Sequence, residues 1–596
     1  MDTQRKSAAR SVIGRTVLAM VVAVAAISVS PVAKSVAAAA PGIDCAPPGT
    51  PRLSTAEDIR RGRLKLGPFP TMRLPINPTW RENPFRDVNW LFRYHTLRWV
   101  LPLVRTWHRT GDAWYIRRAS FLVRDWLAAN PRSAPASAHA WKDLTTAWRT
   151  IVLACMAEAL PRSSWPRTAL AQHGRVLALA SFYTGAGNHA LGQNRALIVA
   201  GCLLRRNDWV RLAVQRLTSL VVRSVDAQGV TNEQSVYYQF YNYLGYNGVA
   251  ARLRQCGRGA PSALGRIDKM PDFLAHATLP DRTYAMLGDT ARHHAFIIKG
   301  TTAEFAATAG ASGPRPRRVF AAYGAGFAFG RTGWGDRRAY RDEAAYSVRY
   351  GPGIRFHGHA DHASVTLYGY GKRLVDDSGL FTLNRNAWRA YAIGRRAHNV
   401  VTVDGLSYRP GSRASLLYAR TNAARDDLVV VDRGYTGVAQ RRRILFSRVG
   451  GYLVVEDRLT ARATRTFRQL WHLDVGTAPV VTGRTVRTTR ATGNLRIVQL
   501  AARPRVTIVK GRRSPIQGWI SETLSHRRAA PVVSGAVRGR AVRYLTVLVP
   551  TRGPNDRVTV RNVRLTATGW SFDIDVAGAR ERVRATAWNS TIVPLP

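Results

Sequence analysis

The periodicity of the apolar residues changes once along this chain, near residue 310, and this change limits its fold more than any other feature. Over 80–310, apolar residues recur at helical spacing in successive segments with short polar breaks. From 319 onward, segments such as HNVVTVDG and YLVVEDRL alternate with period two between Gly, Asp and Pro. The stretch GASGPRPRR at 310–318 is a natural linker. We therefore predict a multidomain α+β protein, with a helical domain over 80–310 and an antiparallel β-sandwich over 319–596.

Turn and cap residues divide the helical half into separate helices. The segment NWLFRYHTLRWVLPLVRTWHRTG predicts a helix that stops at Gly111. Asp112 is a candidate N-cap for the next helix, which should end before Pro131. Helical hairpins with short loops suit a bundle, a solenoid or an α/α toroid, and no fixed repeat length selects one of them.

The first 40 residues have the pattern of a secretory signal peptide. Basic residues precede an apolar run from Val17 to Ile27, and small residues follow up to Ala40. An uncleaved anchor is the alternative, and 41–79 reads as a Pro-rich leader or linker. No later stretch reaches the ~18 apolar residues of a membrane helix, so we expect no transmembrane domain after cleavage and a secreted or cell-envelope location. Three disulfide pairings are open in that compartment among Cys45, Cys155, Cys202 and Cys256.

The charge indicates a polyanionic partner. The 596 residues include 89 Lys and Arg against 36 Asp and Glu, a formal net charge of +53. Such a surface attracts nucleic acid, anionic lipid or acidic polysaccharide. Export and the lack of a dense Lys/Arg block argue against nucleic acid, and we expect an acidic polysaccharide. The oligomeric state stays open.

The segment RFHGHADHASVTLYGYGKRLVDDSG gathers the residue types of a metal or proton-transfer site. In an extended chain, His357 and His359 point to the same face. A zinc-like ion accepts mixed nitrogen and oxygen ligands. It would suit a site made of His359, one of the aspartates in this segment, and His398. The plainer alternative is histidines near a turn that only bond to the backbone.

Two helical segments add candidates. YTGAGNHALGQN places Asn188 and His189 at a helix start, where they could act in catalysis or only cap the helix. TNEQSVYYQFYNYLGY is rich in tyrosine, and Tyr238 and Tyr241 share a helical face. An aromatic stripe of this kind is more often core or a sugar-stacking wall than a catalytic group.

Taken together, these segments resemble the heparinase II/III family of polysaccharide lyases over nearly the whole mature chain. The resemblance rests on TGDAWY, NHALGQN, NEQSVYY and LGDT in the helical half. In the β half it rests on GFAFGRTGW, FHGHADHASVTLYGYGKRLVDDSG, AHNVVTVDG, YLVVEDRL and QLWHLD. The resemblance implies an α/α toroid followed by an antiparallel β-sandwich, and β-elimination at a uronic acid.

The resemblance also implies residue roles. Asn188, with His189, would neutralise the substrate carboxylate, Tyr238 would protonate the leaving oxygen, and His357 is a candidate base. A structural divalent metal, zinc by preference, would be bound by His359, Asp376 and His398, with Asp377 as the alternative to Asp376, and Asp361 and His362 would only support the site through hydrogen bonds. The tyrosine run leaves Tyr237 and Tyr241 as alternatives to Tyr238, and Gln239 stands where relatives often carry histidine.

These observations favour a secreted lyase that cleaves a uronic-acid-containing acidic polysaccharide. Sulfated glycosaminoglycan, alginate and an endogenous exopolysaccharide are all possible substrates, because pocket-lining residues cannot be read from one sequence. The alternative is a non-catalytic protein that binds acidic glycan or assembles envelope polysaccharide on the same scaffold. The presence of Asn188, His189, Tyr238 and His357 together favours the enzyme.

Overall fold

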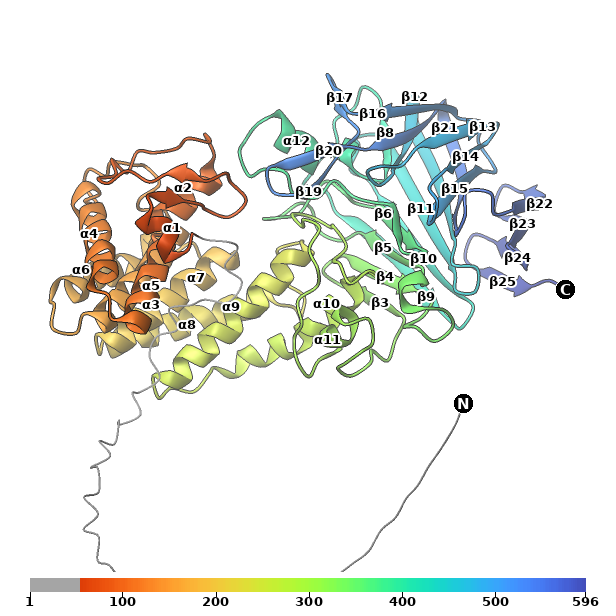
Figure 1. The fold of residues 1–596 in the computed structure, drawn as a ribbon. Coiled ribbons are helices and arrows are strands. Elements are labelled where there is room, and N and C mark those ends of the chain that lie inside the picture. The colour runs from red at the N-terminus through yellow and green to blue at the C-terminus, as the bar shows by residue number, and fades with distance from the viewer. Residues whose placement is uncertain (1–53) are drawn as a thin grey trace, which may run out of the picture. The chain divides into compact units, whose positions relative to one another are not determined.

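The structure is a computed structural model that describes residues 54–596, and these residues belong to one compact unit (Figure 1). The predicted signal peptide and Cys45 therefore lie outside the described residues. No helix within 54–596 is long and apolar enough to span a membrane.

The first part of the described chain is helical and forms the α/α toroid half of the fold. α3 packs on α4, and α5, α6, α7 and α8 pack in sequence order, while α7 also contacts α5 and α9. The elements are α1 (Ala56–Arg60), β1 (Arg63–Leu64), β2 (Met72–Arg73), α2 (Val88–His95), α3 (Leu101–Thr110), α4 (Ala113–Ala129), α5 (Asp143–Ala159), α6 (Trp165–Ala178), α7 (Gly187–Leu203), α8 (Asn207–Ser224), α9 (Val236–Gln255), α10 (Met270–Ala277) and α11 (Thr302–Ala307).

The predicted cap residues end and begin helices where expected, with one difference. Gly111 closes α3 in the left-handed conformation, and the Asp112 side chain accepts a hydrogen bond from the backbone of Trp114 at the start of α4. The segment before Gly111 is two helices rather than one, because Leu97 has a φ of 56° and breaks the helix between α2 and α3. A disulfide between Cys202 and Cys256 joins the last turn of α7 to the end of α9.

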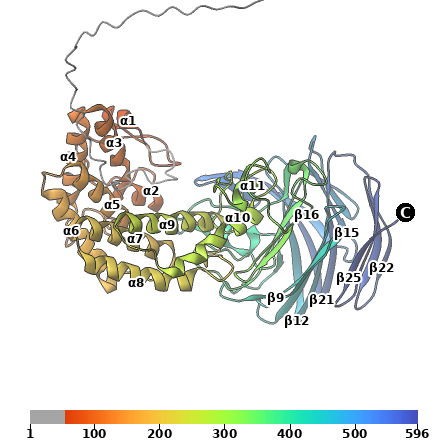
Figure 2. The same cartoon turned by 90° about the horizontal axis from the view of Figure 1, so that it is seen from below.

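The second part consists of antiparallel sheets, as predicted (Figure 2). One sheet has five strands: β3 (Phe320–Tyr323), β4 (Phe327–Arg331), β5 (Ala345–Arg349), β6 (Val365–Gly369) and β7 (Lys372–Val375). The largest has the order β13-β14-β15-β21-β12-β11-β10-β9, with β16 also paired to β21 and β8 to β12. Its strands are β8 (Val401–Val403), β9 (Ala414–Thr421), β10 (Arg425–Asp432), β11 (Val438–Ser447), β12 (Leu453–His472), β13 (Pro479–Thr482), β14 (Thr485–Thr488), β15 (Asn494–Gln499), β16 (Arg505–Lys510) and β21 (Pro531–Thr551).

A third sheet of four strands extends the predicted sandwich. It contains β22 (Val558–Leu565), β23 (Trp570–Val576), β24 (Ala579–Ala585) and β25 (Ser590–Pro594). The large sheet is apolar on both faces: Leu453 and Val455 of β12 pack toward the five-stranded sheet, and Val454 packs toward the four-stranded sheet. Shorter elements are α12 (Ala387–Ile393), β17 (Arg512–Arg513), β18 (Ile516–Gln517), β19 (Trp519–Thr523) and β20 (His526–Ala529).

The helical and β parts share one hydrophobic core, which fixes the start of α9 against the five-stranded sheet. Phe240 of α9 and Phe273 of α10 belong to the same buried cluster as Tyr323, Phe327 and Phe329 of β3 and β4. This packing brings residues from both parts into one site.

Candidate active site

Tyr238 and His357 lie face to face, although they come from different parts of the sequence. Tyr238 is in the first turn of α9, and His357 is in the loop between β5 and β6. Their ring centroids are 3.4 Å apart and their planes differ by 10°. Tyr237 and Tyr241, the alternatives to Tyr238, contact the Tyr238 ring edge-on. The structure thus brings the predicted tyrosine and histidine into direct contact.

The loop of residues 287–290, LGDT in the sequence, holds both partners in place. Thr290 accepts a hydrogen bond from the backbone of Tyr237 and pairs with the Ser235 hydroxyl, which fixes the first turn of α9. Gly288 has a φ of 60°, and a side chain there would lie 2.3 Å from the Gln234 carbonyl and 2.7 Å from the His357 carbonyl. Only glycine allows the three segments to approach this closely.

Asp289, in the same loop, orients the histidines. Its buried carboxylate is 2.9 Å from Nδ1 of His357 and 3.0 Å from Nε2 of His359, and it accepts two hydrogen bonds from Arg389 of α12. Burial alone would raise the pKa of Asp289, but the hydrogen bonds from His357, His359 and Arg389 hold that pKa well below its usual range. A carboxylate at Nδ1 fixes the proton on that nitrogen, so Nε2 of His357 is the nitrogen that can accept one.

Glu233 connects His357 to Asn188. Its Oε1 accepts a hydrogen bond of 2.6 Å from the backbone of Asn188, and its Oε2, buried without a hydrogen bond, lies 3.6 Å from Nε2 of His357. Asn188 is at the start of α7, and its side-chain amide has no hydrogen-bond partner among the described residues. The amide is therefore available to a ligand.

His189 has different surroundings from the other predicted residues. Its Nδ1 is 2.8 Å from Asp143 of α5, and its side chain is 47% exposed. Partial burial lowers the pKa of His189, but the hydrogen bond and charge of Asp143 outweigh this effect and raise the pKa. Glu233 adds a smaller effect of the same sign, so His189 borders the site and favours its charged form.

Tyr238 is strongly held in its protonated form. Burial is the main cause, followed by the negative charges of Asp289 and Glu233, and together they raise its pKa well above the usual value. A tyrosine in this state can donate a proton to a developing oxyanion.

Arginines approach the tyrosines from the helical part. Arg98 lies over the ring of Trp148 at 4.0 Å, and Arg195 lies over the same ring at 5.5 Å. Burial lowers the pKa of Arg98 to about 10 and also lowers the pKa of Arg93, where the nearby Tyr237, Tyr238 and Tyr241 partly oppose the effect. Within residues 54–596, neither Arg93 nor Arg98 forms an ion pair with an acid. These partly buried charges suit an anionic ligand.

His359, Asp377 and His398 form a cluster that could bind a metal. One ligand atom from each lies within 4.8 Å of the others, and all three side chains are buried. Nδ1 of His359 and Nε2 of His398 are buried without hydrogen bonds, although imidazole nitrogens normally find a partner. Two nitrogen donors and one carboxylate fit a zinc-like ion. Asp289, bonded to the opposite nitrogen of His359, would orient that ligand.

Asp376 lies outside this cluster. Its carboxylate pairs with Arg292 at 3.1 Å and Arg373 at 3.0 Å, so the structure places Asp377, the alternative, with the two histidines. Asp361 pairs with Arg349, and His362 bonds to Tyr408 and to the backbone carbonyl of Pro352, so these bonds do not join either residue to His359, Asp377 or His398.

Comparisons with known proteins agree with the motifs. The heparinase II/III N-terminal family model matches residues 69–308, and the heparinase II/III-like C-terminal model matches 324–554. The chain belongs to the heparinase II/III family of polysaccharide lyases. A heparin-sulfate lyase of Bacteroides stercoris is 20% identical over 569 residues, which cover 84% of this chain and 82% of that protein.

Solved structures of heparinases share the fold of this family member. The crystal structure of heparinase III has a TM-score of 0.74 at 17% identity and covers 85% of both chains. A mutant heparan sulfate lyase of Pedobacter heparinus has a TM-score of 0.67 at 20% identity, covering 89% of this chain and 88% of that one. At these identities the likeness establishes the fold, an α/α toroid followed by a β-sandwich.

Two residues of this heparinase-like site had no role in the sequence prediction, Glu233 and Asp289. Both lie in motifs that carry the family resemblance, NEQSVYY and LGDT. An acidic residue inside a short family motif was the available signal for both, but the groups that each carboxylate contacts are distant in sequence.

Proposed function

We propose that this protein cleaves a uronic-acid-containing acidic polysaccharide by β-elimination at the site around Tyr238 and His357. The observation that carries the proposal is the stacked pair, with Asp289 behind the histidine and Asn188 joined to it through Glu233. The pair places a proton acceptor and a proton donor side by side, as the elimination requires.

The first step removes the C5 proton of the uronate. The free amide of Asn188 donates to the substrate carboxylate as negative charge builds there, and His189 adds positive charge nearby. Nε2 of His357 accepts the proton as the C5–H bond breaks. The imidazolium that forms lies between the carboxylates of Asp289 and Glu233, which stabilise it.

The second step expels the glycosidic oxygen. The C4–O bond breaks as the C4–C5 double bond forms, and the Tyr238 hydroxyl donates its proton to the departing oxygen. His357 then carries an extra proton and Tyr238 lacks one. Transfer of a proton from His357 to Tyr238, whose rings are in contact, restores both groups.

Charges on the helical side support an anionic polymer as substrate. Arg93 and Arg98 can pair with carboxylates or sulfates of the flanking sugars. Phe356, 49% exposed and next to His357, offers an apolar face to a sugar ring. The relatives named as heparin or heparan sulfate lyases make these polymers the first to test.

We also propose that His359, Asp377 and His398 bind a structural divalent metal, zinc by preference. Bound there, the ion would supply rigidity behind the catalytic histidine and take no part in proton transfer. We further propose that residues 1–40 direct export, because an acidic polysaccharide of this kind is met outside the cytoplasm.

The test is the ultraviolet absorbance of the unsaturated uronate product, whose new double bond is conjugated with its carboxylate. Mature protein is incubated with heparin, heparan sulfate, hyaluronan, chondroitin sulfate, alginate and the host's own exopolysaccharide. A rise with one polymer that Tyr238→Phe abolishes would support the proposal and give the substrate class. Tight, salt-sensitive binding with no product from any polymer would instead favour the non-catalytic glycan-binding alternative.

A further inference from the structure

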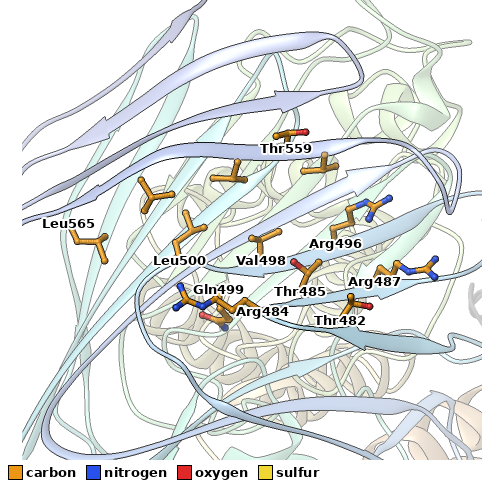
Figure 3. A pocket seen from close by; sticks show the side chains of 13 residues that line it. Thr482, Arg484, Thr485, Arg487, Arg496, Val498, Gln499, Leu500, Thr559 and Leu565 are labelled. Carbon is orange, nitrogen blue, oxygen red and sulfur yellow. The ribbon is translucent and has the colours of Figure 1, made fainter.

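A second basic groove lies in the β part, apart from the active site (Figure 3). It has a volume of about 870 Å³ and is bounded by β14 and β15 of the large sheet and by β22 of the four-stranded sheet. Arg484, Arg487 and Arg496 line it. β22 follows residue 554, where the match to the C-terminal family model ends, so one wall lies outside that match.

The register of the sheet places two of these arginines directly opposite each other. Arg487 of β14 and Arg496 of β15 are cross-strand partners, and both guanidinium groups extend to the same end of the groove in Figure 3. Like charges directly opposite each other destabilise a sheet. An anion bound between them would convert this repulsion into attraction.

The groove also lacks compensating acids. None of its described lining residues is Asp or Glu, and Arg484, Arg487 and Arg496 form no ion pair within residues 54–596. Nη2 of Arg496 donates to the backbone carbonyl of Asp556 at 2.5 Å, which orients the guanidinium, and the Asp556 carboxylate acts on it only through space, without an ion pair. By contrast, Arg443, also on the large sheet, is paired with Asp427.

Apolar and hydroxyl groups line the rest of the groove. Val498, Leu500 and Leu565 form an apolar surface, and Thr485 and Thr559 add hydroxyls. An adjoining hollow of about 250 Å³ shares Arg484 and extends the basic lining to Arg503. A sugar polymer with anionic substituents matches this combination, because a pyranose ring has apolar C–H faces and hydroxyl edges.

We propose that this groove is an accessory binding site for an acidic polysaccharide. Arg487 and Arg496 bind a carboxylate or sulfate of the chain, and the sugar faces lie on Val498, Leu500 and Leu565. The inference that the bound polymer is also the substrate rests on the proposed function. The inference that the groove binds an anion does not depend on it. The groove holds the chain to the enzyme while the active site cleaves elsewhere along it.

Binding to the groove is tested in a protein that cannot cleave. In a Tyr238→Phe background, Arg484→Gln with Arg487→Gln is compared with Arg109→Gln plus Arg132→Gln. The control loses the same charge at two exposed arginines of the helical part that form no ion pair among the described residues. The probe is long-chain heparan sulfate at fixed salt, with neutral dextran as a blank.

We expect the groove variant to raise the Kd for heparan sulfate by about tenfold, since charged hydrogen bonds are lost, and the control to change it little. An equal loss in both variants, or no binding by the parent, would overturn the proposal. Arg487→Gln alone should raise the melting temperature, because it removes repulsion with Arg496. A lower melting temperature with unchanged Kd would show a structural role and also overturn it.

In cleavage-competent protein, the groove variant should raise KM for long chains and leave both kcat and the rate on a tetrasaccharide unchanged. An equal effect on the tetrasaccharide would overturn the accessory role. The binding measurement needs no turnover, so a failure of the lyase proposal would leave its result intact and distinguishable.

Discussion

A buried carboxylate and a pair of partly buried arginines lie near Tyr238 and are arranged in opposite ways. The carboxylate of Asp289 is fully engaged, by two histidines and by both nitrogens of Arg389. Arg93 and Arg98, on the helical side, have no acidic partner within the described residues. Both guanidinium groups are partly buried without an acidic partner, so an anionic ligand would complete this second group. The comparison indicates that Asp289 and its partners are already positioned for catalysis, whereas Arg93 and Arg98 form a surface that binds an anion.

The largest expected effect is at Tyr238, which lies near both groups of charge. Tyr238→Phe should lower kcat by about 10²–10⁴-fold and leave polysaccharide binding unchanged, because it removes the proton donor but keeps the stacked ring. Initial rates of product absorbance and a separate binding measurement check this. Tyr237→Phe is the matched control and should stay active. Full activity in Tyr238→Phe would exclude it as the acid.

Removing the charge of Asp289 should lower activity, because this carboxylate orients His357. Asp289→Asn keeps the shape but no longer fixes the tautomer of His357, and we expect kcat to fall by roughly 10²-fold or more. It also leaves Arg389 without its partner, so the melting temperature should fall. Steady-state kinetics and thermal unfolding are compared with Asp404→Asn, which disrupts an exposed ion pair with Arg468. Wild-type kcat in Asp289→Asn would contradict the positioning role.

The metal content of variants at Asp376 and Asp377 tests the carboxylate side of this comparison. Asp377→Asn should lower metal affinity by at least about 10–100-fold and reduce stability, and a chelator should then have no further effect. Asp376→Asn should retain the metal and lose stability only because Arg292 and Arg373 lose their partner. Elemental analysis with thermal unfolding separates them. Metal loss in Asp376→Asn alone would assign the ligand to the other aspartate.

These residues also show which features of the fold and of the site could be predicted from the sequence. The order of toroid and sandwich was predictable because helical and strand periodicities differ, and the family motifs agreed. Asp376 and Asp377 could not be separated, since side chains alternate along an extended chain and a shift of one residue exchanges their faces. The contact of Tyr238 with His357 depends on how α9 docks on the sheet, which no local pattern encodes. Asp289 was missed for the same reason.

On the arginine side we expect a binding defect rather than a catalytic one. Arg98→Gln should raise KM for the polymer by about tenfold with little change in kcat, because its charge serves ground-state and transition-state binding alike. Without its ligand the variant should change little in stability, since a partly buried unpaired charge and its contact with the Trp148 ring are removed together. Kinetics at several salt concentrations test this, with Arg109→Gln as control. A fall in kcat with constant KM would place Arg98 in the chemistry instead.

The smallest effect is expected at His189, on the border between the two groups. Its pKa is raised in the folded protein, so its pairing with Asp143 stabilises the fold below the unfolded pKa of about 6.5 and is lost as the pH rises through the folded value. Because the pair is half exposed, the gain is only a few tenths of a kcal/mol. His189→Gln should therefore lower the melting temperature slightly near pH 5 and leave it unchanged near pH 9. If the kcat of His189→Gln also falls sharply at acidic pH, His189 acts on the substrate carboxylate together with Asn188. If the kcat of the variant follows the wild type at every pH, His189 only stabilises the fold through its pair with Asp143.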